Sequence, residues 1–180
     1  MTALKVAAGE RVKVDAILLE LDPGEKIGSG IVLVLPECAS AALPSRGMNL
    51  IEGTINDVPF QAVVEPNGKG SHWFKVSDDL REAAHAGAGS TVTLEIEPSK
   101  DWPEPKVPAD LAQALTANPR AQALWLDITP MARWDWIRWI GATRSPRTRQ
   151  RRIVAGIDKM VSGKRRPCCF DRGQRTLTDA

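Results

Sequence analysis

Histidine, cysteine and carboxylate side chains carry much of the nucleophilic and acid–base catalysis in enzymes, and this chain has few of them in a recognisable pattern. It contains two histidines, His72 and His85. Neither has an acidic residue and a serine or cysteine at the spacing of a known catalytic triad. We therefore expect both histidines at the protein surface or at the rim of a β-barrel, and the sequence favours a non-enzymatic protein.

Cysteine is sparse: Cys38 stands alone, and Cys168 and Cys169 are adjacent within KRRPCCFDRGQR. The arginines beside this pair favour the reactive thiolate, so Cys168 and Cys169 are candidates for a redox-sensitive tail, with an inert tail as the alternative. A zinc site needs paired ligands at a regular spacing, and these are missing. The glycine-containing segments 24–30 and 65–73 lack the pattern of a phosphate-binding loop and are typical of turns. We expect no metal and no cofactor.

The segment RWDWIRWIGATRSPRTRQRRI, residues 133–153, holds three tryptophans and seven arginines. Aromatic and cationic side chains together are typical of a nucleic-acid groove. Helical spacing places Trp136 and Trp139 on or beside the apolar face of one helix and leaves Trp134 nearer the surface. The arginines follow in the next helix, which we expect to begin at Ser145 and Pro146. The two residue types therefore lie on different helices and need not form one groove.

Arginines crowd the start of this second helix, where positive charge opposes the helix dipole. Two interpretations stay open. In the first, an acidic partner compensates the positive charge, and this partner is either the acidic first half of the chain or an external anion. In the second, only solvent and salt compensate it. The candidates for binding an anion or a partner are Arg144, Arg147, Arg149, Arg151, Arg152, Lys164, Arg165 and Arg166.

Charge is distributed unevenly along the 180 residues, although the formal net charge is +2. Residues 1–100 hold nine basic and fourteen acidic residues, a net charge of −5, and residues 101–180 hold fifteen basic and eight acidic residues, a net charge of +7. This change of sign predicts two units with different surfaces. The basic half is suited to a polyanion such as a nucleic acid, and the other expected partner is an unknown protein or small molecule.

Residues 1–98 show the periodicity of strands. Apolar residues at 12, 14, 16 and 18 alternate with a second, mostly polar set, and the run IVLVLP at 31–36 is typical of a strand covered on both faces. Two stretches offset by forty-two residues each read as strand, short helix, glycine and strand. About six strands and two short helices of this kind predict a small closed β-barrel, since closure removes exposed strand edges.

Four prolines within residues 97–108 predict an extended, proline-rich linker at 99–108. Beyond it, apolar residues recur at helical spacing, and pairs of a capping residue and proline mark helix starts. We expect about four short α-helices at 109–163 and a basic, flexible tail at 164–180. The predicted fold class is therefore α+β, with a β-barrel domain at 1–98 followed by a helical domain.

Several segments of the second half resemble the YdeI/OmpD-associated family, often named bacteriocin-protection proteins: VPADLAQAL, WIRWI, RSPRTRQRRI and SGKRRPCCF. The first half resembles the small β-barrel domain of unknown function that is often fused upstream, through EGTINDVPFQAVVEPNGKGSHWFKVSDDLREAA and GAGSTVTLEIEP. The resemblance covers nearly the whole chain. It implies a bacterial cytosolic protein linked to envelope stress or bacteriocin tolerance, and it carries over no catalytic or binding residues.

Three hypotheses of function follow. The first is a non-enzymatic interaction or stress-protection module, the second a nucleic-acid or other polyanion binder that uses the basic C-terminal helix and tail, and the third an enzyme with a pocket between barrel and helices. No apolar run is long enough to span a membrane, and the N-terminus lacks the apolar stretch of a secretory signal. Sparse cysteine suits reduced thiols, so we expect a cytoplasmic protein.

Overall fold

The chain folds into two compact units. The computed structural model describes residues 11–21 and 30–167. The described residues up to Asp101 form the barrel unit, and those from Trp102 onward form the helical unit. Strands dominate the first unit and helices make up the second, so the α+β fold class predicted from the sequence is confirmed.

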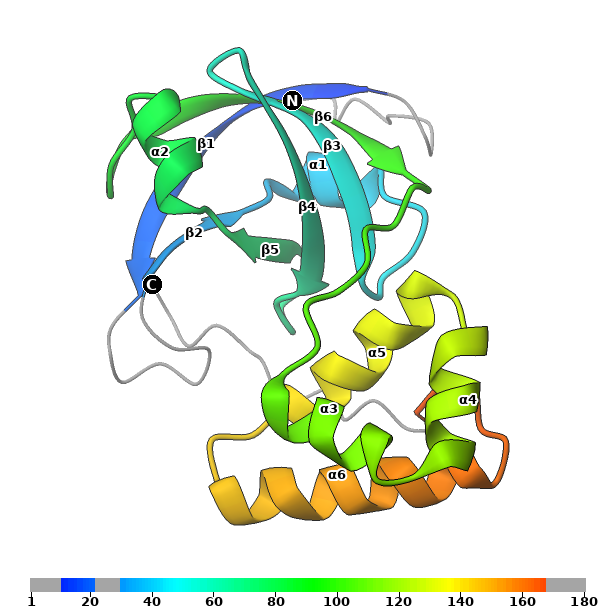
Figure 1. Ribbon diagram of the computed structural model, residues 1–180. Helices are drawn as coiled ribbons and strands as arrows, with labels where there is room; N and C mark the ends of the chain where they lie inside the picture. The colour runs from blue at the N-terminus through cyan, green and yellow to red at the C-terminus, as the bar shows by residue number, and fades with distance from the viewer. Residues whose placement is uncertain (1–10, 22–29, 168–180) are drawn as a thin grey trace. The chain divides into compact units, whose positions relative to one another are not determined.

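Six strands close the barrel in the order β1-β2-β5-β4-β3-β6 (Figure 1). Every neighbouring pair is antiparallel, and the pairing closes the sheet on itself, with β5 joined to β4 through Glu65 and Pro66. The elements of this unit are β1 (Val12–Leu21), β2 (Gly30–Val34), α1 (Glu37–Ala41), β3 (Asn49–Ile55), β4 (Val58–Pro66), β5 (His72–Lys75), α2 (Asp78–Ala83) and β6 (Thr91–Ser99).

Apolar side chains that alternate along the strands fill the barrel interior. In β1, Val12 and Ala16 are buried and Lys13 is exposed, as the alternation predicted. β2 is buried on both faces, because Leu33 belongs to the main core and Val32 to a second cluster. The predicted internal repeat is also present, since β2-α1-β3 and β5-α2-β6 share the order strand, helix, strand.

Four helices form the helical unit, as predicted (Figure 1). Three of them begin with a capping residue whose side chain accepts a backbone N–H, followed by proline in the first turn: Asn118, Thr129 and Ser145. Across the described residues, no helix combines the length and apolar character that crossing a membrane requires. The helices are α3 (Ala109–Thr116), α4 (Pro119–Asp127), α5 (Pro130–Gly141) and α6 (Pro146–Val161).

All four helices contribute to the core of the helical unit, and its pair of tryptophans lies where α5 packs against α6. Trp136 is fully buried and meets the half-buried Trp139 edge to face, with ring centroids 5.9 Å apart. Gly156 of α6 lies against both rings, and the predicted place of these tryptophans in or beside the core is confirmed. Trp134 is half-buried, and its Nε1 donates to the carbonyl oxygen of Pro103. α6 thus has one face fixed in the core and another that faces away from it.

Candidate functional site

His72 is buried, so the prediction of a surface or rim position was wrong for this residue: its exposed fraction is 1 %. Nε2 lies 2.8 Å from the carbonyl oxygen of Gly47, which can only accept, so Nε2 carries a hydrogen. In the neutral ring Nδ1 is then the acceptor, and the Ser40 hydroxyl donates to it over 2.8 Å. The sequence pattern missed this burial because the partners lie 25 and 32 residues away along the chain.

A serine that donates to a histidine is also the arrangement of a catalytic nucleophile and its base. Ser40 has an exposed fraction of 1 %, however, so no substrate reaches its hydroxyl. Asn49 completes the arrangement by donating to the carbonyl oxygens of Ser45 and Gly47 over 2.9 Å each. We call Ser40, Gly47, Asn49 and His72 the buried polar network, and its contacts hold α1 and the loop after it against β5. His85, in contrast, is exposed as predicted.

Two of the candidate arginines are held inside the helical unit. Nε and Nη2 of Arg149 donate to the two carboxylate oxygens of Asp110 in α3, over 2.6 and 2.8 Å. These hydrogen bonds lower the pKa of Asp110 below its ordinary value. Arg152 donates to the carbonyl oxygen of Trp139 over 2.9 Å and lies over the indole ring, 5.7 Å from its centroid. An acidic residue of the helical unit therefore compensates Arg149.

Two more candidates, Arg165 and Arg166, lie just beyond the end of α6 and pair with carboxylates of α4 and α5. Arg165 donates to a carboxylate oxygen and the carbonyl oxygen of Asp127, over 2.5 and 2.9 Å. Nε of Arg166 lies 3.7 Å from Asp135. Burial raises the pKa of Asp135, and the positive charges of Arg166 and Arg138 partly oppose this effect. Sequence reasoning missed Asp135, because an acidic residue between two tryptophans reads as the polar side of a helix.

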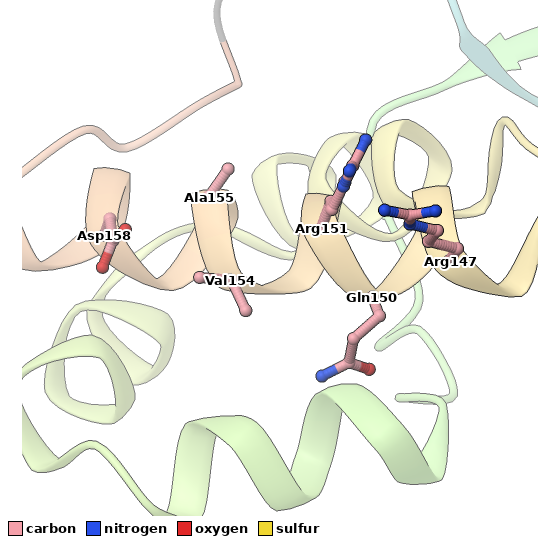
Figure 2. A pocket seen from close by; sticks show the side chains of 6 residues that line it. All are labelled: Arg147, Gln150, Arg151, Val154, Ala155 and Asp158. Atoms are coloured by element: carbon pink, nitrogen blue, oxygen red, sulfur yellow. The ribbon is translucent and has the colours of Figure 1, made fainter.

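Arg147 and Arg151 differ from these four. Both are exposed, and within the described part of the chain neither side chain makes a hydrogen bond or an ion pair. They line a pocket of about 460 Å³ on α6, and Figure 2 shows that all six labelled side chains come from this helix. Arg144 and Lys164 lie exposed just before and just after the helix. We call the lining residues the outer face of α6: Arg147, Gln150, Arg151, Val154, Ala155 and Asp158.

The outer face carries a straight seam of side chains. Arg147, Arg151, Val154 and Asp158 follow one another at intervals of four, three and four residues, which keeps them on one side of a helix. Val154 has an exposed fraction of 54 %, whereas its neighbour Ile153, on the core side, has 1 %. An exposed apolar residue between unpaired charges, beside a pocket, makes the outer face of α6 the candidate docking site.

Within the part of the chain that the structure describes, the remaining candidates add no second site. Cys168 and Cys169, predicted as a redox-sensitive tail, lie outside the described residues. Cys38 is a free, exposed thiol in α1. Among residues 11–21 and 30–167, no group of three or more histidine, cysteine or acidic side chains is placed to hold a metal ion.

Comparison with known families assigns both halves of the chain. Residues 15–96 match the family described as a domain of unknown function, DUF1905. Residues 104–163 match the family described as bacteriocin-protection, YdeI or OmpD-associated. No curated protein sequence matches the chain. The resemblance identified from the sequence segments is therefore confirmed for both halves.

Proposed function

From the match of residues 104–163 to the family described as bacteriocin-protection, YdeI or OmpD-associated, we propose that the chain is a non-enzymatic module that contributes to bacteriocin protection by docking a partner protein. The docking surface is the outer face of α6. The observation that carries the proposal is the pair of exposed arginines, Arg147 and Arg151, that stay unpaired within the described residues beside the exposed Val154. Neighbouring arginines on the same helix have partners, so the unpaired ones are free to bind another molecule.

The composition of this face favours a protein over a polyanion such as a nucleic acid. A polyanion gains from every added positive charge and is repelled by acidic residues. The seam places Asp158 and Val154 in line with the two arginines, and neither helps to hold a phosphate backbone. At least four of the eight basic candidates, Arg149, Arg152, Arg165 and Arg166, are engaged inside the helical unit, which reduces the charge that is free for phosphates. A partner with acidic, apolar and basic groups in order fits the seam better.

The buried polar network supports a non-enzymatic function. The nucleophile–base pair that the described residues contain, Ser40 and His72, is closed off from solvent and tied to backbone groups. A reaction there would require the barrel to open. The exposed, unpaired arginines Arg147 and Arg151 instead lie on α6, where the side chains are suited to binding.

A survival assay tests the proposal. Cells that lack the gene are complemented with the full chain and challenged with purified bacteriocins, one that forms pores and one that is a nuclease. We expect protection against at least one of them from the unaltered chain. The variant Val154→Asp, which places a charge at the apolar centre of the outer face, should lose this protection.

Leu126→Asp is the matched control, because Leu126 of α4 is even more exposed than Val154, at 68 %. Both substitutions add one negative charge to an exposed helix position, and each is expected to change the free energy of unfolding by less than about 0.5 kcal/mol. Protection that survives Val154→Asp, or that is lost equally in Leu126→Asp, would contradict the proposed docking surface. No protection by the unaltered chain would contradict the proposed function itself.

A further inference from the structure

The charges of the outer face are arranged against the dipole of their own helix. A helix stabilises acidic residues near its N-terminus and basic residues near its C-terminus. α6 does the opposite on this face: Arg147 lies in its first turn and Asp158 in its last turn. Both side chains are exposed and neither is paired within the described residues, so no internal contact of the described chain explains the arrangement.

An antiparallel neighbour reverses this disadvantage. The C-terminal end of a second helix, which is negative, would then lie beside Arg147, and its positive N-terminal end beside Asp158. A second copy of α6 supplies both the dipole and the charges. We propose that the outer face of α6 binds the outer face of α6 in a second copy of this chain, antiparallel and about a two-fold axis; this inference rests on the proposed docking function and names its partner.

The residues of the outer face are complementary to one another when a two-fold rotation relates the two copies. Placing the two-fold axis at the level of Arg152 and Ile153 brings position 147 opposite 158, position 150 opposite 155, and position 151 opposite 154 in the second copy. Two ion pairs between Arg147 and Asp158 then flank the centre, roughly 16 Å apart along the helices at 1.5 Å of rise per residue. The alternation of four and three residues along the seam is the spacing that packs one helix against another.

The centre of this contact is where the apolar groups lie. Val154 of each copy meets the aliphatic stem of Arg151 in the other, and the stem covers the valine while the guanidinium stays in water. Ala155 is small enough to let Gln150 of the other copy pack beside it. A single pair of helices buries less surface than a standard-size interface, so the dimer is weak and forms at high protein concentration.

Two other occupants explain the face less well. A polyanion uses the arginines but is repelled by Asp158. A foreign acidic helix pairs with the arginines, but nothing in the described chain fixes where its basic group would have to lie. The second copy accounts for all six residues with no group added. Both other occupants predict a chain that stays monomeric, so the experiment separates them from the proposal.

Sedimentation equilibrium of the full chain tests the inference through charge reversal. The unaltered chain should show a reversible monomer–dimer equilibrium whose dissociation constant rises with salt concentration. Arg147→Glu alone and Asp158→Arg alone each place like charges opposite one another twice in the dimer. Each should raise the dissociation constant about tenfold, since two exposed ion pairs are lost and replaced by repulsion.

The double variant Arg147→Glu with Asp158→Arg restores opposite charges across the axis, and its dissociation constant should return to within about threefold of the original. These variants will fold, because each reversal puts the charge that the dipole of α6 prefers at its end of the helix. Arg120→Glu is the control: Arg120 is an exposed arginine of α4 without a partner in the described chain, and its reversal should leave the equilibrium unchanged.

Three results would overturn the inference. A chain that stays monomeric up to about millimolar concentration excludes the second copy as occupant. A double variant as weak as the single ones excludes the antiparallel register. If the single charge reversals leave the dissociation constant unchanged, any dimer must form through a different surface. If Val154→Asp still abolishes bacteriocin protection in a monomeric chain, the docking function stands and its occupant is a different protein.

Discussion

The buried polar network of the barrel and the outer face of α6 both gather polar side chains, but they differ in how their polar groups are satisfied. In the network, the groups of Ser40 and His72 meet partners within the barrel and have an exposed fraction of 1 %. On the outer face, Arg147 and Arg151 are exposed and unpaired within the described chain. Residues that look catalytic in isolation thus serve the fold, while residues that look like an ordinary solvated face are free to bind.

The same contrast holds between arginines of one helix. Arg149 and Arg151 are two residues apart, which turns them to different sides of α6. Arg149 is locked to Asp110, and Arg151 has no partner among the residues described. The state of pairing, more than the residue type, separates a stabilising charge from a binding one.

The largest effect on stability is expected from the buried network. His72→Ala leaves the Ser40 hydroxyl and the Gly47 carbonyl oxygen buried without their partner, and it should lower the free energy of unfolding by about 3 kcal/mol. Urea unfolding measures this, with His85→Asn as control, because His85 is exposed at φ +49°, a conformation that asparagine tolerates. Equal free energies of unfolding for the two variants would show that the buried polar network does not stabilise the fold.

The sequence predicted the strands that carry this network but not the network itself. Alternation along β1 and the repeat of strand, helix and strand are local signals, and both are present. The position of His72 depends on contacts with Ser40 and Gly47, which the fold brings together from distant parts of the chain. No periodicity of a single sequence encodes such a contact.

The outer face should show the reverse behaviour, with an effect on association and almost none on stability. Val154→Lys should raise the dissociation constant of the dimer about tenfold, because each new ammonium lies opposite Arg151 of the other copy and like charges then meet twice at the centre of the contact. Its urea midpoint should match that of Leu126→Lys. A large loss of stability in Val154→Lys alone would mean that the outer face is part of the folded core.

A smaller effect distinguishes the paired arginine from the unpaired one. Arg149→Ala should lower the free energy of unfolding by about 0.5 kcal/mol at neutral pH, because the ion pair with Asp110 is partly exposed. Arg147→Ala should change it by less.

This difference depends on pH in a defined direction. The pKa of Asp110 is lowered in the folded state, so the ion pair stabilises the fold above the ordinary aspartate pKa of about 4 and the effect is lost as the pH falls through the lowered pKa. Urea unfolding of both variants between about pH 7 and pH 2.5 measures it. A difference that grows on acidification would contradict the assignment of the ion pair.

For α6, the sequence indicated which residues lie on the helix and which side is buried. The Ser145–Pro146 start and the apolar stripe through Ile153, Ile157 and Met160 are both confirmed. The partner of each arginine was not predictable from the sequence. Asp110 and Trp139, which bind Arg149 and Arg152, belong to other helices, and the packing of those helices against α6 determines these contacts. The charges at the two ends of α6 oppose its dipole. The sequence showed part of this arrangement, as arginines near the helix N-terminus.

The most direct test of the account is the survival assay carried out with the charge-reversal set. Arg147→Glu and Asp158→Arg, each alone, should reduce bacteriocin protection, and the double variant should recover it, because opposite charges then face one another again between two copies. Recovery in the double variant would tie protection to the antiparallel contact of α6. A double variant that protects no better than either single one, at equal protein levels in the cell, would contradict the proposal that protection depends on contact between two copies of α6.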